Sequence, residues 1–219
     1  MASRSRAIPA VVERSERSSV HEPRDNDVRW PGAVGTFALF GEVLWVGVLV
    51  CVTGALVITL PAALAAGSRH LRRYLAAEEA SVRTFARDFR MALPGGLLVG
   101  LAFVVAIIVL LIDLALASAG IPGGPIVLAA GIVGLAGVGT VLVRAAYSWG
   151  DSAGWRSALS SATRTLRGDI VGTVYLVVAL ALLVLITWQL LPLVIPAVGC
   201  LVFASVAISE RRRAVNDSV

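Results

Sequence analysis

The sequence predicts an all-α protein, a polytopic membrane helical bundle with five transmembrane helices and two cytoplasmic amphipathic helices. Two observations lead to this fold class. Hydrophobic residues make up 58% of the 219 residues and charged residues only 15%, an apolar excess that soluble domains rarely carry. The apolar residues are also gathered into runs of about 20, the length at which a helix crosses a hydrocarbon layer of roughly 30 Å.

The five apolar runs define a membrane domain over residues 30–209. The first run is too short to cross the membrane twice, because two crossings need about 40 residues and a turn; it is expected to end at a break near Leu60-Pro61. The fifth run reaches only about 24 Å as a helix, close to the minimum for a span. The predicted spans are about 34–58, 95–118, 125–147, 170–189 and 193–208.

Both ends of the chain are polar. Residues 1–29 mix charges without hydrophobic periodicity and are expected to form a disordered tail. They lack the apolar core of a signal peptide. Residues 210–219 are expected to form a basic C-terminal tail.

Two segments between the spans show apolar residues at helical spacing, with arginine on the other faces. In the first, the apolar positions include Val82, Phe85 and Phe89; in the second they include Trp155 and Leu159. Such patterns are typical of helices that lie on a membrane surface or pack beneath a bundle. Both are predicted to be cytoplasmic interfacial helices.

Arginine placement predicts the orientation. Five spans put the termini on opposite sides of the membrane, and 13 of the 19 arginines then fall on the side of the C-terminus. The N-terminal tail carries the other six, offset by five acids. Basic residues in short loops favour the cytoplasm, so the C-terminus is expected there and the N-terminus outside. The same arginines account for the pI of about 10.2, and no nucleic-acid binding is predicted.

Glycines are frequent in the third predicted span, which is therefore expected to be the central helix. Gly131, Gly134 and Gly137 would let a neighbouring helix approach closely, since helix association in lipid depends on small residues. Packing within the chain is the favoured interpretation, and a homo-oligomer contact is the alternative.

Two acids interrupt apolar runs, Glu42 in the first span and Asp113 in the second. By helical rise they would lie about 12 Å and about 8 Å below the outer surface, the side on which Gln189 ends the fourth span. In one interpretation Asp113 reaches interfacial water and Glu42 is protonated or hydrogen-bonded to a neighbouring helix. In the other, the three side chains line a polar cavity open to the outside, because intramembrane acids often mark transport sites.

No catalytic constellation, metal site or cofactor motif is expected. Cys51 and Cys200 lie far apart in apolar segments, and His21 and His70 are isolated in the sequence. No nucleotide-binding loop is present either, so ATP coupling would require a partner.

The chain carries, in this order, Val43-Leu44-Trp45, Thr59 with Pro61-Ala62, Glu78-Glu79, and Phe85 with Phe89. Through these positions, residues 35–209 resemble the YesL-like family of bacterial integral membrane proteins, a domain of unknown function. Members of that family commonly have Asn where this chain has Glu42.

The resemblance implies a location in the bacterial inner membrane and an accessory or regulatory role in the uptake of a solute, with carbohydrates as the suggested class. The expected partners are then the lipid bilayer and transporter subunits. The alternative function is a stand-alone transporter or channel that uses the outer acidic cavity.

Overall fold

The computed structural model describes residues 35–119, 123–150 and 154–217, and in these ranges it contains seven α-helices and no strand. Within the described residues, five helical stretches are long and apolar enough to cross a membrane, which confirms the all-α class and the predicted number of spans. The chain is therefore a multi-pass membrane protein. The helices are α1 (Thr36–Thr53), α2 (Leu60–Leu75), α3 (Val82–Ser118), α4 (Gly124–Ser148), α5 (Gly154–Gly168), α6 (Ile170–Gln189) and α7 (Val194–Asp217), with short 3-10 helices η2 (Val57–Thr59) and η3 (Leu191–Leu193).

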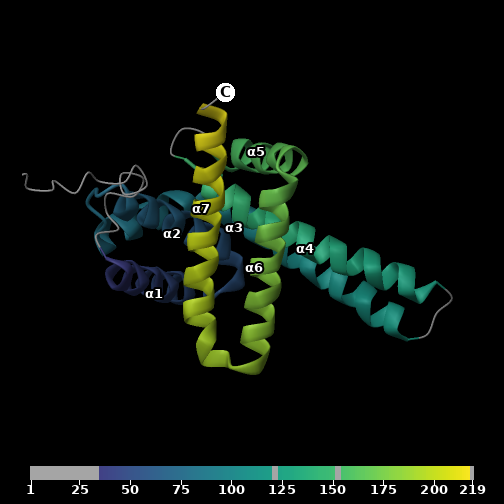
Figure 1. Ribbon diagram of the computed structural model, residues 1–219. Coiled ribbons are helices and arrows are strands. Elements are labelled where there is room, and N and C mark those ends of the chain that lie inside the picture. Colours follow the sequence, from purple (N-terminus) through teal and green to yellow (C-terminus); the bar gives the residue numbers. More distant parts are fainter. Residues whose placement is uncertain (1–34, 120–122, 151–153, 218–219) are drawn as a thin grey trace, which may run out of the picture.

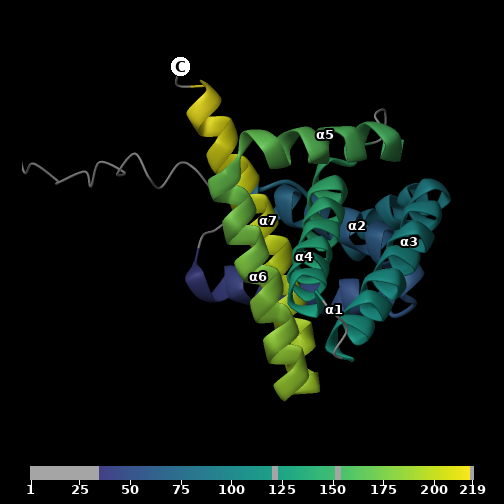
Figure 2. The same cartoon turned by 90° about the vertical axis from the view of Figure 1, so that its right-hand side faces the viewer.

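The helices do not stand parallel to one another. Figure 1 shows α6 and α7 as an antiparallel pair, with α1 and α2 running across them. The antiparallel hairpin of α3 and α4 projects away from the other helices in the same view. The amphipathic helix α5 lies across one end of α4, as Figure 2 shows from the side.

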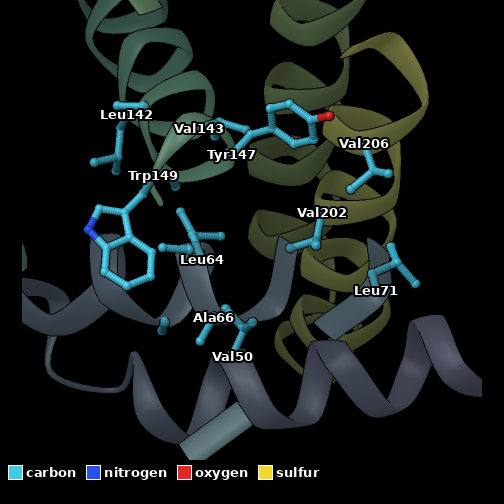
Figure 3. Packing of buried hydrophobic residues seen from close by; sticks show 14 of the residues in the cluster. Val50, Leu64, Ala66, Leu71, Leu142, Val143, Tyr147, Trp149, Val202 and Val206 are labelled. Carbon is cyan, nitrogen blue, oxygen red and sulfur yellow. The ribbon is translucent and has the colours of Figure 1, made fainter. Parts of the chain in front are cut away.

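The most fully buried helix is α2, although α4, formed by the segment that was predicted to be central, contacts α2, α3, α5, α6 and α7. Eleven of the 16 residues of α2 are buried, against nine of the 25 in α4. It packs on α1, α3, α4 and α7. Figure 3 shows Leu64 and Leu71 of α2 between α1, α4 and α7. Hydropathy misses α2 because six of its eleven buried residues are alanine, glycine or serine and its last turns carry arginine, so the segment looks like a loop.

The first predicted interfacial helix is not a separate element, because residues 82–93 form the start of the 37-residue α3. Pro94 lies inside this helix and removes one backbone hydrogen bond. Neighbouring helices commonly compensate such a loss in membrane proteins. Here α2 runs antiparallel along both sides of Pro94, since its His70 meets Phe85 and its Ala62 meets Gly96.

The first and last described helices are joined by two glycines. A Cβ atom on Gly47 of α1 would meet the backbone oxygen of Ile195, and one on Gly199 of α7 would meet the backbone oxygen of Val43. The two backbones therefore approach so closely that there is no room for a Cβ atom at either glycine, and small residues of this kind commonly allow helices to pack in lipid. This contact fixes where α1 crosses α7.

Two predicted boundaries differ from the structure. The first span is shorter than expected, because α1 ends at Thr53 and Gly54 follows as its C-cap. The helix α7 continues to Asp217, through most of the predicted C-terminal tail. The predicted N-terminal tail, residues 1–29, lies outside the described residues.

Candidate functional site

The last turns of α2 carry four charged or ionisable side chains that point in three directions. Arg69 and Arg73 are four residues apart and share one helix face, whereas His70 and Arg72 lie on two others. The acidic partner of each face lies on a different helix: Asp88 on α3, Glu42 on α1 and Glu210 on α7. We call these four side chains and their partners the polar hub.

His70 joins α2 to α1. Its Nε2 lies 2.7 Å from Oε1 of Glu42, and the ring packs edge-on against Phe85 of α3 with 6.2 Å between ring centroids. The imidazole is buried, while about a fifth of the Glu42 side chain is exposed. The acid that interrupts the first apolar run therefore has a partner inside the fold.

The contacts of His70 favour one tautomer. Its Nδ1 is buried and has no hydrogen-bond partner among the described residues. If Nε2 carries the proton and donates to an ionised Glu42, Nδ1 keeps only an unpaired lone pair. A protonated Glu42 or a doubly protonated ring would place an N–H group at Nδ1, which is costlier to leave unpaired.

Asp88 joins α3 to α2. Its carboxylate is fully buried, and Oδ2 receives a hydrogen bond of 2.6 Å from Nη1 of Arg73 and lies 3.5 Å from Nε of Arg69. Arg69 also lies over the ring of Trp149, 5.4 Å from its centroid. A buried carboxylate requires such partners, because an unpaired charge in this environment is strongly destabilising.

Arg72 completes the hub towards α4 and α7. Its guanidinium lies 5.3 Å from the ring centroid of Tyr147 on α4, and its Nε is 4.0 Å from Oε1 of Glu210 on α7. The Tyr147 hydroxyl donates a hydrogen bond of 2.7 Å to the same carboxylate oxygen. The hub therefore connects α2 with all four of its neighbours.

A second buried contact links α4 with α6. Nη2 of Arg144 lies 3.3 Å from Oδ2 of Asp169 and donates to the Thr173 hydroxyl over 3.2 Å. Asp169 also caps α6, since its Oδ1 accepts from the backbone N–H of Gly172. Arg144 is therefore held inside the protein.

The three side chains of the predicted outer cavity are not brought together. Asp113 is exposed near the end of the projecting α3–α4 hairpin, and Gln189 is exposed at the last residue of α6. Figure 1 shows these two helix ends at separate corners of the molecule. Glu42 meets His70 instead. Depth along upright helices could not predict this, because depth says nothing of the face that each side chain occupies.

The predicted interfacial residues fall into two groups. Phe85 and Trp155 are buried, and Phe89 and Leu159 pack against the core, whereas Val82 is half-exposed. Nε1 of Trp155 donates a hydrogen bond of 2.8 Å to the backbone oxygen of Ala92. Both segments therefore pack within the protein along their apolar faces.

The three glycines of α4 that were predicted to pack against other helices also fall into two groups. Side chains added at Gly131 and Gly134 would meet Leu114 and Leu110 of α3, so these glycines lie at the hairpin interface. Nothing lies within 4 Å of a Cβ placed on Gly137, which instead lines an open groove.

Sequence reasoning missed most of the hub. His70 looked isolated because Glu42 lies 28 residues away, and Tyr147 and Glu210 lie 63 residues apart. One signal was present: five of the six residues from Ala62 to Gly67 are alanine or glycine, which is typical of a helix packed closely on several sides. Arginines that follow such a run are expected to meet partners inside the bundle.

The chemistry available in the hub is ion pairing and hydrogen bonding between helices. The Glu42–His70 contact has the groups of a proton relay, but no acceptor or donor follows His70 Nδ1 among the described residues. No group of three or more His, Cys, Asp or Glu side chains among the described residues could hold a metal ion.

Comparison with protein-family models, curated proteins and solved structures found no match, so the assignment of a function rests on the geometry of the chain itself.

Proposed function

We propose that this protein is an accessory or regulatory subunit of a membrane transport system and acts by contact between helices. The observation that carries this proposal is the α3–α4 hairpin, which projects from the other helices (Figure 1). Among the large apolar side chains of α3 that are at least half exposed, four recur at spacings of four, three and four residues, which places them on one stripe of the helix. We call Leu101, Val105, Ile108 and Ile112 the hairpin stripe.

A stripe of this spacing suits a second helix as well as lipid, since apolar residues at alternating intervals of three and four form the contact seam between paired helices. The polar hub supports the same function, because its charged groups are used to hold α2 to its neighbours. A subunit that works by docking needs such a rigid core and an outward face that is left free.

The solute and the orientation belong to the same proposal. Resemblance to the YesL-like family suggests a carbohydrate transporter in a bacterial inner membrane as the partner. The arginine distribution supports an outside N-terminus and a cytoplasmic C-terminus.

The test is a pull-down of the tagged chain from its own membranes in mild detergent, with the eluate read by mass spectrometry. A transporter subunit in about equal amount is expected with the wild type and should be lost when Val105 and Ile112 are both changed to Trp. The matched control is Val178→Trp with Leu182→Trp, which changes two half-exposed apolar side chains on α6.

Two results would overturn the accessory role. One is recovery of the same partner from the Val105/Ile112 variant, which would show that the hairpin stripe is not the contact. The other is elution of the chain alone, or only with an untagged second copy, together with solute movement in liposomes that depends on Glu42 or Asp113. That outcome would identify a stand-alone transporter or channel.

A further inference from the structure

A groove between α3 and α4 is open to the surroundings and shares only Trp149 with the polar hub. Its larger hollow has a volume of about 590 Å³ and is lined by apolar side chains, including Ala102, Ala106 and Val138, together with Gly137. Its smaller hollow, of about 390 Å³, lies towards α5 and includes Met91, Trp149 and Arg156. The two hollows are continuous, because Leu98, Val99 and Leu159 line both.

The groove is apolar at one end and cationic at the other. Arg156 lines the smaller hollow, and Met91 borders both this hollow and a surface patch formed by Arg83, Arg87 and Arg90. These four arginines are exposed, and none has a hydrogen bond or ion pair among the described residues. The arginines of the hub, in contrast, all have partners.

The dimensions suit one chain of a lipid. From Gly95 to Ala106 the α3 wall of the groove extends about 16 Å by helical rise, close to the roughly 15 Å of hydrocarbon in one leaflet. Along its whole length α3 measures about 55 Å, so it must leave the hydrocarbon layer. Its charged first three turns place the arginine patch at the level of lipid headgroups.

We infer that this groove binds one anionic phospholipid, with an acyl chain between α3 and α4 and the phosphate beside Arg156 and the patch at Arg87 and Arg90. Unpaired arginine is the residue expected to hold phosphate oxygens at a membrane surface. Trp149 and Trp155 line the smaller hollow, and indole rings favour the membrane interface, where lipid phosphates lie. This binding would hold whichever partner docks on the hairpin stripe.

The test is native mass spectrometry of the full chain in mild detergent, with dioleoyl phosphatidylglycerol or dioleoyl phosphatidylcholine added. Wild type is expected to retain one phosphatidylglycerol with roughly tenfold preference over phosphatidylcholine. Arg90→Gln with Arg156→Gln should remove the preference. The control pair is Arg164→Gln with Arg167→Gln, which lowers the charge equally on residues that line neither hollow.

A second variant tests the acyl-chain site without disturbing packing. Gly137→Phe places a ring in open space inside the groove and should abolish retention of either lipid. Gly41→Phe is the control, because nothing lies within 4 Å of a Cβ on Gly41 either and it lies on α1. If Gly137→Phe does not fold, Ala102→Trp fills the same hollow from an exposed position on α3.

Three results would overturn the inference: equal retention of the two lipids by wild type, retained phosphatidylglycerol in a folded groove-filling variant, or equal loss of preference in both arginine pairs. Inorganic phosphate in excess should not displace the bound lipid, because it lacks the acyl chain. Displacement by phosphate would show that the arginines bind a free anion.

Discussion

His70 on α2 and Glu42 on α1 form a hydrogen bond of 2.7 Å between Nε2 and Oε1, and this bond lies beside Phe85 of α3. Three helices therefore meet at one imidazole. The acid on α1 lies in an apolar segment because it satisfies a buried donor on α2.

Loss of this acceptor should destabilise the protein, whereas an isosteric acceptor should not. Glu42→Ala leaves the buried N–H of His70 without a partner and is expected to lower the free energy of unfolding by about 1–3 kcal/mol. Glu42→Gln keeps an oxygen that can accept and should unfold much nearer to the wild type. Unfolding by detergent titration measures both; equal stability of all three proteins would show that the bond contributes nothing.

The two aspartates of α3 should differ sharply in their effects. Asp88→Asn removes the negative charge from between Arg69 and Arg73 and is expected to lower the free energy of unfolding by about 3–5 kcal/mol. Asp113→Asn, at an exposed position without a partner in the described part of the chain, should have little effect on unfolding. Thermal unfolding in detergent compares the two variants, and a stable Asp88→Asn protein would contradict this account of the hub.

The α1–α7 crossing should not tolerate side chains. Gly47→Leu or Gly199→Leu forces atoms against the backbone of the opposite helix, which cannot move aside as a side chain can. We expect each to cost about 3 kcal/mol or more and to lower the yield of monodisperse protein in size-exclusion chromatography. Gly41→Leu, on the open side of α1, is the matched control and should elute normally.

The contribution of Trp155 to holding α5 in place can be tested with a single substitution. Trp155→Phe removes the hydrogen bond to the backbone oxygen of Ala92 and should cost about 1 kcal/mol, with faster cleavage near α5 in limited proteolysis. Trp188→Phe, at a highly exposed position on α6, is the control. Unchanged proteolysis of Trp155→Phe would mean that α5 is held by other contacts.

The proposed orientation predicts which end of the chain an impermeant reagent reaches in whole cells. With Cys51 and Cys200 changed to Ser, a cysteine introduced by Ser18→Cys should react with an impermeant maleimide, whereas Ser218→Cys should react only after lysis. The reverse pattern would show that the topology is inverted. Labelling of both introduced cysteines before lysis would exclude an odd number of spans.

The fold class and the number of spans could be predicted from the sequence. The burial of α2 among the other helices could not. Long apolar runs predict spans, because lipid demands continuous apolar helices. The segment of α2 gives no such signal, since its burial depends on alanine at closely packed positions and its arginines resemble those of a cytoplasmic loop. Hydropathy measures affinity for lipid, and α2 is buried in protein.

The candidate site was still harder to predict, for a geometric reason. Glu42 is conspicuous in the sequence as an acid within an apolar run, but its partner His70 lies in the α2 segment, which resembles a loop. Asp113 drew attention for the same reason and has no partner in the described residues. A sequence gives the depth of a residue along a helix, whereas pairing depends on the helix face and on the angle at which two helices cross.

The crossing of α1 and α7 has a consequence for biosynthesis. About 150 residues separate the two glycines that make this contact, so at 5–20 residues per second the ribosome needs roughly 8–30 s to supply the second after the first. During that interval the newly inserted α1 lacks the helix that covers it. A chain truncated before α7 should therefore stay incompletely assembled in the membrane and be removed by quality-control proteases, however well its first four spans insert.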